Sequence, residues 1–299
     1  MTAALATEVS AAADRIRPHV RHTPLLRAEV DGRPLVLKLE HLQRTGSFKL
    51  RGAINALLSG ETPGEVVTAS GGNHGIGVAT AAAILGLPAT VYVPTSVPES
   101  KARRIESAGG RLVRTGDHYA DAAAAAREAA SKPGVRYVEA YNDATVIAGQ
   151  GTVAAEIVRD APDVDTIAVA VGGGGLAAGL ALGGEGRLIA AVEPAHCACL
   201  HAAFAAGEPV DAEVDSVAAS ALGATRVGDV PFGVLSSRPV RSLVVSEDEI
   251  VNARIRLWDE FRLAVEPAAA VPFAAWLGGA VPGELPCVVI CGANTEWTP

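Results

Sequence analysis

The sequence predicts an α/β fold in which parallel strands form a sheet flanked by helices. Short apolar runs alternate with helical stretches along almost the whole chain, which is typical of parallel strands joined by crossover helices. Hydrophobic residues make up 49% of the 299 residues and aromatic residues only 4%. Alanine, valine and leucine must therefore build the core, which suits helices packed closely on a parallel sheet. A chain of this length is comfortably divided between two packed lobes.

Each expected strand is a short apolar run that ends at a turn. Such runs occur at Leu35–Glu40, Glu65–Ala69, Ala89–Val93, Arg111–Arg114, Val135–Glu139, Thr166–Val171, Arg187–Val192, Ser242–Val245 and Cys287–Ile290. Helical patterns lie between them at Asn73–Leu85, Pro98–Ala108, Asp117–Ala130 and Val146–Arg159. Before a further helix at Ile250–Phe261, the spacing of Ser246 and Glu249 predicts a capping box.

Charge and cysteine usage narrow the class of protein. With 25 basic and 33 acidic residues, the formal net charge is −8, which argues against a nucleic-acid partner. We find no signal peptide and no charge-free apolar run of about 18 residues, so we expect a cytoplasmic protein without a membrane span. The cysteines do not form two CxxC pairs, so we expect reduced, mostly buried thiols and no structural zinc; they are Cys197, Cys199, Cys287 and Cys291.

Sheets of this kind bind ligands at the carboxyl ends of their strands, so the turns after the strands hold the candidate site. The first such segment carries Lys49, which stands beside Phe48 and Leu50 at the expected start of a helix. A low dielectric and the positive end of a helix both disfavour the ammonium form, and a neutral amine is what a Schiff-base lysine needs. The alternative is an ordinary surface lysine.

The second segment runs from Ser70 through Gly71, Gly72, Asn73 and His74, directly after an expected strand. Small residues before a helix expose several backbone N–H groups, which together can cradle an anion such as a carboxylate. The alternative is a plain tight turn.

The third segment is the run of four glycines from Gly172 to Gly175, followed by Leu176. Such a loop lets backbone N–H groups wrap a phosphate at the start of the next helix. A dinucleotide site is the rival, because Gly172, Gly174 and Ala177 fit the looser fingerprint and Glu193 lies about twenty residues on. A plain flexible turn is the third possibility.

The fourth segment begins with Cys291, after the last expected strand. A thiol there is a weak hydrogen-bond partner, and the residue alone favours a buried structural cysteine over a nucleophile.

Together these segments resemble the fold-type II pyridoxal-phosphate (PLP) enzymes, specifically the serine/threonine dehydratase and serine racemase group. Gly46–Ala53 is similar to the lysine motif of that family, and Val146–Thr152 and Glu266-Pro267 match two others. The resemblance extends from His22 to Asn294, and it favours a single phosphate over a dinucleotide at the glycine loop.

The resemblance implies a role for each candidate residue. Lys49 would form a Schiff base with PLP and then remove the Cα proton of the substrate. The expected cofactor contacts are Phe48, Asn73, Gly172, Gly173, Gly174, Gly175, Leu176, Glu266 and Cys291. The substrate carboxylate would lie against Ser70, Gly71, Gly72, Asn73 and His74.

The resemblance also implies a two-domain fold similar to the tryptophan synthase β-chain. Residues 1–64 and 143–299 would form the larger, PLP-binding domain, and residues 65–142 a smaller substrate-side domain. The expected assembly is a homodimer. The implied reaction is dehydration and deamination of a small β-hydroxy amino acid, of the L-threonine or L-serine type, to a 2-oxo acid and ammonia.

Several alternatives stay open at this point. The chain resembles serine racemases too, as well as other PLP enzymes of β-elimination or replacement; the non-enzymatic alternative is a silent anion- or nucleotide-binding protein. Gly71 stands where serine racemases carry a serine, so we expect little racemisation. The family often binds a cation near Glu193, but Cys199 replaces the second carboxylate, so we expect no metal. Tyr141 and the segment Ala218–Ser220 also depart from the family pattern beside the expected substrate.

Overall fold

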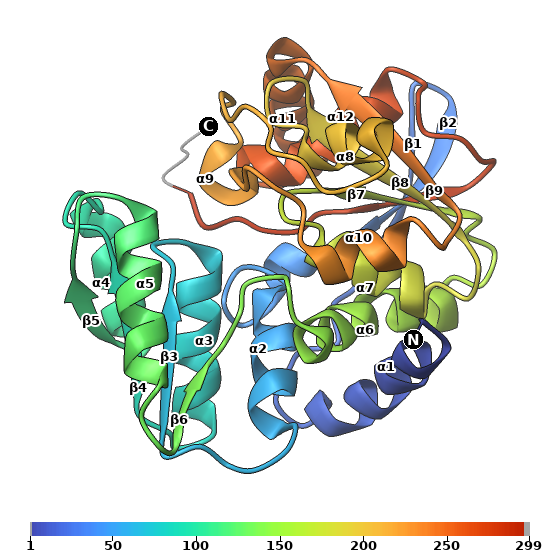
Figure 1. The fold of residues 1–299 in the computed structure, drawn as a ribbon. Helices are drawn as coiled ribbons and strands as arrows, with labels where there is room; N and C mark the ends of the chain where they lie inside the picture. Colours follow the sequence, from blue (N-terminus) through green and yellow to red (C-terminus); the bar gives the residue numbers. More distant parts are fainter. Residues whose placement is uncertain (1, 296–299) are drawn as a thin grey trace.

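The alternation of strands and helices forms two separate sheets in the computed structural model, which describes residues 2–295 (Figure 1). The larger sheet has six strands: β1 (Leu25–Val30), β2 (Arg33–Lys38), β7 (Thr166–Ala170), β8 (Leu188–Pro194), β9 (Val240–Val245) and β10 (Pro286–Val289). The smaller sheet has four strands: β3 (Glu65–Ala69), β4 (Ala89–Val93), β5 (Arg111–Arg114) and β6 (Val135–Tyr137). The α/β prediction is confirmed.

Helices cover both sheets. In Figure 1, α1 (Thr2–Ile16), α6 (Ala144–Asp160), α7 (Gly175–Gly183) and α10 (Asp229–Leu235) lie on one side of the larger sheet. On its other side lie α8 (Cys199–Ala206), α9 (Ala219–Leu222), α11 (Glu247–Phe261) and α12 (Pro267–Leu277). The smaller sheet carries α3 (Asn73–Ile84), α4 (Glu99–Ser107) and α5 (Tyr119–Ala130). Between the sheets, α2 (Lys49–Leu58) packs against both α3 and α6, and a short 3₁₀ turn, η1 (Glu40–Leu42), precedes it.

One pair of strands departs from the parallel arrangement that the sequence predicts. The larger sheet has the order β1-β2-β10-β7-β8-β9, and β1 pairs with β2 in antiparallel fashion. Strand β1 is not among the predicted strands, because it lies at the sheet edge with an irregular burial pattern in which only Val30 is fully buried. Asp31 and Gly32, both with positive φ, form the turn between the two strands. An Asp-Gly pair between apolar runs is a recognised hairpin signal, so the sequence did contain the clue.

The other expected elements agree with the structure to within a few residues. The expected strand Leu35–Glu40 ends at Lys38, and Glu40 instead begins η1. The capping box before α11 is confirmed: the Ser246 hydroxyl accepts the Glu249 backbone N–H, and the Glu249 carboxylate accepts the Ser246 backbone N–H. Helix α12 is not among the predicted helices, because it is buried on nearly every face and so has no amphipathic pattern.

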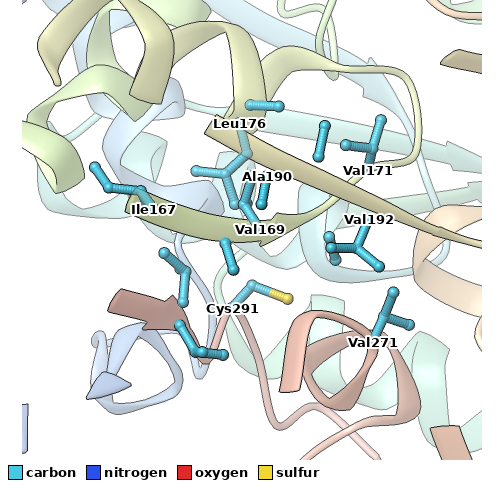
Figure 2. Close-up of a cluster of buried hydrophobic side chains, with 14 of the residues drawn as sticks. Ile167, Val169, Val171, Leu176, Ala190, Val192, Val271 and Cys291 are labelled. Carbon is cyan, nitrogen blue, oxygen red and sulfur yellow. The ribbon is translucent and has the colours of Figure 1, made fainter. Parts of the chain in front are cut away.

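The main hydrophobic core lies between the larger sheet and its helices. Figure 2 shows side chains from both faces of β7 and β8: Ile167 and Val169 lie on the side of Leu176 of α7, and Val192 lies on the side of Val271 of α12 and of Cys291. All these side chains are buried. Small aliphatic side chains thus fill the core, and the carboxyl ends of β7 and β10 are held rigidly where the third and fourth candidate segments begin.

The smaller sheet consists of consecutive strands from residue 65 to residue 137, all of which fall within the stretch 65–142. The division into two domains at those boundaries stays a prediction. Within residues 2–295, no helix combines the length and apolar character that crossing a membrane requires.

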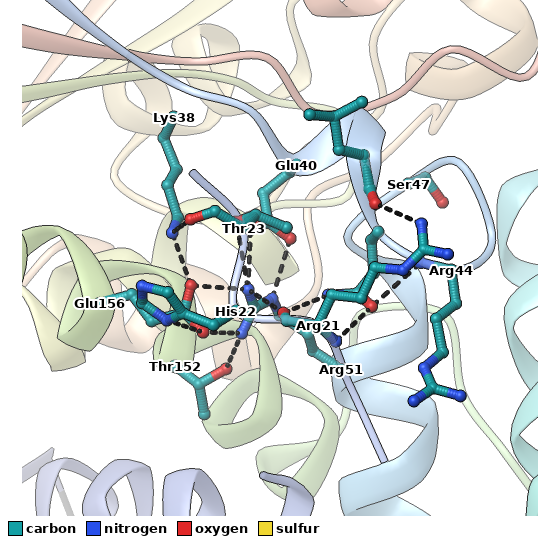
Figure 3. Close-up of polar contacts among 12 residues, drawn as sticks. Arg21, His22, Thr23, Lys38, Glu40, Arg44, Ser47, Arg51, Thr152 and Glu156 are labelled. Carbon is teal, nitrogen blue, oxygen red and sulfur yellow. Dashed lines mark hydrogen bonds and ion pairs between the residues drawn. The ribbon is translucent and has the colours of Figure 1, made fainter. Parts of the chain in front are cut away.

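A buried ionic network fixes α2 against the larger lobe (Figure 3). Arg51 is fully buried. Its guanidinium donates to both carboxylate oxygens of Glu40, at 2.8 and 2.9 Å, and to Glu156 of α6, at 2.8 Å. Lys38 of β2 pairs with the same Glu156, and Thr23 donates to Glu40. Two cations therefore balance two carboxylates, and the position of Arg51 two residues after Lys49 fixes the start of α2.

Replacing Arg51 with alanine should destabilise the fold by about 3–5 kcal/mol, because the fully buried Glu40 carboxylate would lose its cationic partner and the partly buried Glu156 would keep only Lys38. Urea unfolding followed by circular dichroism measures this change. As a control, Arg27→Ala removes an exposed ion pair with Asp163 and should leave the unfolding midpoint nearly unchanged. Equal midpoints for the two variants would show that the network does not stabilise the fold.

Candidate active site

Every residue that the sequence assigned to the site lines one cavity of about 450 Å³. This volume suits a small organic ligand. The cavity is bordered by the start of α2, the turn between β3 and α3, the glycine loop between β7 and α7, and Cys291 after β10. The structure thus brings the four candidate segments together, while their roles toward a ligand stay predictions.

Three helices begin at this cavity without a side-chain cap. Lys49 is the first residue of α2, Asn73 of α3 and Gly175 of α7, and no side chain caps any of the three N-termini. The first N–H groups of a helix have no partner inside the helix, and they carry the positive end of its dipole. The cavity therefore offers backbone donors to anionic groups from three directions.

The Lys49 amine lies in the cavity wall. Its Nζ donates to the Ala140 carbonyl oxygen at 2.8 Å and lies 5.2 Å from the centre of the Phe48 ring. Burial lowers the pKa of Lys49 to about 8, although Cys291 and Glu266 act in the opposite direction. The amine therefore becomes neutral near physiological pH, as a nucleophile or general base requires.

Asn73 and Glu266 of the cavity wall form a hydrogen-bonded chain with Asn294, which lies just outside the cavity. Asn73 Nδ2 donates to the Glu266 carboxylate at 2.8 and 3.1 Å, and its Oδ1 accepts from Asn294 Nδ2 at 2.7 Å. Asn294 also donates to the Thr45 carbonyl at 2.8 Å. This chain joins α3 on the smaller sheet to the segments around β10 and α12.

His74 is held as a neutral ring. Burial, assisted by the charge of Lys49, lowers its pKa to about 3. Its Nε2 lies 3.0 Å from the Val138 carbonyl oxygen. Because a carbonyl only accepts, the proton of the neutral ring belongs on Nε2. The side chain therefore anchors the start of α3 to the end of β6, and the backbone of this segment is left to face the cavity.

The glycine loop is packed too closely for any side chain. A Cβ on Gly173 would lie 2.4 Å from three ring carbons of Tyr141, and one on Gly172 would lie 3.0 Å from Leu222 Cα. Gly174 has a φ of +90°, which favours glycine. The Tyr141 ring therefore lies directly against the loop, an approach that only glycine permits.

Cys291 is buried at the end of β10, and burial raises its pKa well above the ordinary value for a thiol. It is therefore a neutral thiol rather than a nucleophilic thiolate. Its carbonyl accepts the Phe48 N–H at 3.2 Å, and Glu266 N–H donates to the next carbonyl, of Gly292, also at 3.2 Å. The fourth segment thus contacts both the lysine segment and Glu266.

Part of the cavity wall was not predicted as site. The residues concerned come mainly from α4 and the loop before it, from α5 and from α9, namely Ser96, Val97, Lys101, Tyr119 and Leu222. No local pattern marks them, because only the packing of the two lobes brings them to the cavity. Tyr141, which departs from the family pattern in the sequence, lines the cavity as well.

The residues present fit the cofactor that the sequence suggests. Pyridoxal phosphate carries an aldehyde, a phosphate and a pyridine nitrogen. The cavity contains an amine of lowered pKa at Lys49, the uncapped start of α7 behind the glycine loop, and a buried neutral thiol at Cys291. Each of these groups suits one functional group of the cofactor: the amine suits the aldehyde, the helix start suits the phosphate, and the thiol suits the pyridine nitrogen.

Comparisons with known proteins agree with this fit. A family model described as "Pyridoxal-phosphate dependent enzyme" matches residues 16–292. The chain is 37% identical to an L-threonine ammonia-lyase of Geobacter sulfurreducens, over 97% of this chain and 75% of that protein. It is 32% identical to a serine racemase of Arabidopsis thaliana, over 96% and 92% respectively. Its fold is similar to the crystal structure of a threonine deaminase of T.th., with a TM-score of 0.92 and 33% identity over 98% and 99% of the two chains.

Gly173→Ala should destabilise the protein by about 1–3 kcal/mol, because the new methyl group would overlap the Tyr141 ring. Thermal unfolding measures this loss, and adding Tyr141→Ala should recover part of it. The control is Gly278→Ala, where the added Cβ would meet nothing closer than 3.6 Å. If the two glycine variants unfold at the same temperature, the loop is not as tightly packed as described.

The Lys49 amine should lose its proton near pH 8, compared with about 10.4 for an ordinary lysine. The sign follows from burial, which disfavours the charged form and so favours the neutral amine at a lower pH. The rate of labelling by a small amine-reactive reagent, followed residue by residue with mass spectrometry, gives the midpoint. The same lysine in urea-unfolded protein is the control, and matching midpoints in the two states would contradict the prediction.

Proposed function

The chain belongs to the family of pyridoxal-phosphate dependent enzymes, and from this premise we propose that it is a lyase acting on a small β-hydroxy amino acid. The reaction is dehydration and deamination of a substrate of the L-threonine or L-serine type, with release of a 2-oxo acid and ammonia. The observation that carries the proposal is the convergence of the Lys49 amine, the glycine loop and three uncapped helix starts on one cavity. The similarity to an L-threonine ammonia-lyase supports the reaction class.

Lys49 is the catalytic residue of this proposal. When bound, pyridoxal phosphate supplies an electron sink for the charge left at the substrate Cα. The Lys49 amine would hold the cofactor and would serve as the base that removes the Cα proton of the substrate. Its pKa of about 8, below the value of about 10.4 for an ordinary lysine, makes the neutral amine that both tasks require more available at pH 7–8.

The other candidate residues bind and orient. The glycine loop and the start of α7 would hold the phosphate through backbone N–H groups. Cys291 would be the neutral partner of the pyridine nitrogen, which suits elimination. The remaining cofactor contacts are Phe48, Asn73, Leu176 and Glu266. The substrate carboxylate lies at the uncapped start of α3, against Ser70, Gly71, Gly72, Asn73 and His74.

Racemisation is the second candidate, because a serine racemase is among the relatives. It needs an acid on the face of Cα opposite the lysine. Gly71 has no side chain to serve there, and a Cβ at this position would lie 2.9 Å from Val97 Cγ2. Val97 thus occupies the space that such a side chain would need. A glycine at this position favours elimination over reprotonation.

Two further parts of the proposal concern assembly and compartment. We propose that the protein is a homodimer, on the strength of the family resemblance alone. We also propose that it acts in the cytoplasm, where its four buried, unpaired cysteines stay reduced.

The decisive experiment supplies purified enzyme and cofactor with a panel of hydroxy amino acids that includes L-threonine and L-serine. At least one should yield 2-oxo acid and ammonia in equal amounts. Lys49→Ala should lower turnover by about 10²–10⁴-fold, since it removes the general base, while Lys132→Ala on the exposed surface should not. D-serine formed from L-serine faster than pyruvate would instead favour the racemase, and no product from any substrate would remove the lyase proposal.

A further inference from the structure

A cluster of buried polar groups lies behind the glycine loop, on the side away from the cavity. Glu193 lies near the end of β8 and is fully buried. Its two carboxylate oxygens accept the backbone N–H groups of Leu200 and His201, each at 2.8 Å. Burial raises the pKa of Glu193 to about 7, and the two N–H donors and the nearby Cys199 thiol act in the opposite direction. These donors belong to the first turn of α8, where the helix itself supplies no acceptor, so Glu193 fixes α8 to the end of the strand.

Two cysteines at this fixed helix start point to the cavity wall. The Cys199 thiol donates to the Gly172 carbonyl at 3.3 Å, and the Cys197 thiol donates to the Leu222 carbonyl at 3.3 Å. Both acceptor residues line the cavity. They also lie side by side, because a Cβ added at Gly172 would be only 3.0 Å from Leu222 Cα. Each thiol therefore holds one of two backbone segments that meet at the phosphate-binding end of the cavity.

The two thiols are suited to be permanent donors. Both are buried and neither is in a disulfide. Burial, together with the Glu193 charge, raises the pKa of Cys199 to about 12 and that of Cys197 to about 11. They stay protonated at neutral pH and are poor nucleophiles. Chemical reactivity therefore does not explain why cysteines occupy these two positions.

A divalent cation fits this cluster poorly. Mg²⁺ and Ca²⁺ prefer several oxygen ligands, whereas here the one carboxylate is already engaged by two N–H donors. In the part of the chain that the structure describes, no group of three His, Cys, Asp or Glu side chains is arranged to hold a metal.

We propose that Cys199, assisted by Cys197, is a positioning residue that fixes the glycine loop through its thiol. This role rests on the proposed function only in so far as the loop is taken to bind the phosphate of the cofactor. Glu193 fixes the start of α8, and Cys199 is the first residue of that helix. The Cys199 thiol can therefore hold the Gly172 carbonyl in one position without help from a ligand.

The test compares Cys199→Ala and Cys199→Ser with the wild type, with two readouts that need no turnover. One is amide hydrogen exchange of residues 172–176 without cofactor; the other is the affinity for pyridoxal phosphate, from absorbance titration. Cys199→Ala should speed loop exchange and weaken cofactor affinity by about threefold to tenfold, as expected for one modest hydrogen bond. Cys199→Ser, which keeps a donor, should lie within about twofold of the wild type.

The matched control is Cys287→Ala, because Cys287 is equally buried but lies at the opposite end of β7, beside Ile167. It should change neither readout. If Cys199→Ala does not fold, Cys199→Val removes the donor with less loss of volume. The proposal is overturned if a donor-free variant matches the wild type, if Cys199→Ser is as damaging as Cys199→Ala, or if Mg²⁺ tightens cofactor binding by the wild type. If the wild type binds no cofactor, the proposed function is wrong. Amide hydrogen exchange of residues 172–176 would still decide whether the thiol fixes the loop.

Discussion

The constraint on which this site depends is the meeting of three uncapped helix starts at one buried cavity. Backbone N–H groups from α2, α3 and α7 make the cavity a poor place for a cation and a good one for an anion. Burial acts in the same direction on the basic side chains around it. Lys49 loses its proton readily, His74 is neutral, and Glu266 is the nearby carboxylate whose charge offsets the lysine when it is protonated. Such a site is arranged for ligands that bring their own negative charge, which an amino acid carboxylate and a phosphate both do.

Holding these helix starts in place requires support from outside the cavity. The Arg51 network secures α2 to β2 and α6. A buried ion network of this kind contributes little net stability against an apolar alternative, yet losing one member is costly. Its value lies in fixing one arrangement of α2, and with it the direction of Lys49. The chain from Glu266 through Asn73 to Asn294 does the same for α3, and so connects the smaller sheet to the larger one.

Sequence patterns predicted most of this site because its chemistry is local. The lysine, the two glycine-rich turns and Cys291 each follow a strand, and all of them line the cavity. Glu266 came from resemblance, since a Glu-Pro pair has no distinctive chemistry of its own. The opposite wall, with Lys101 and Tyr119, could not be predicted, because its position depends on how the lobes pack. In the fold, helix α12 was not predicted because a helix that is buried on all sides has no periodic hydrophobic pattern. Strand β1 was not predicted because an exposed edge strand lacks a clear alternation of apolar and polar residues.

The packing of Tyr141 on the glycine loop couples two functions that the sequence presents separately. The loop is proposed to hold the phosphate, while Tyr141 lies beside the expected substrate. A Cβ at Gly173 would overlap the Tyr141 ring, and one at Gly175 would lie 2.8 Å from Tyr141 Cβ. The aromatic ring is thus positioned by the absence of side chains on the loop, whose Gly172 carbonyl accepts a hydrogen bond from the Cys199 thiol. A substitution at position 141 would therefore also change the packing of the loop. If the loop holds the phosphate and Tyr141 borders the substrate, as proposed above, then substrate preference and cofactor affinity are coupled through this one contact.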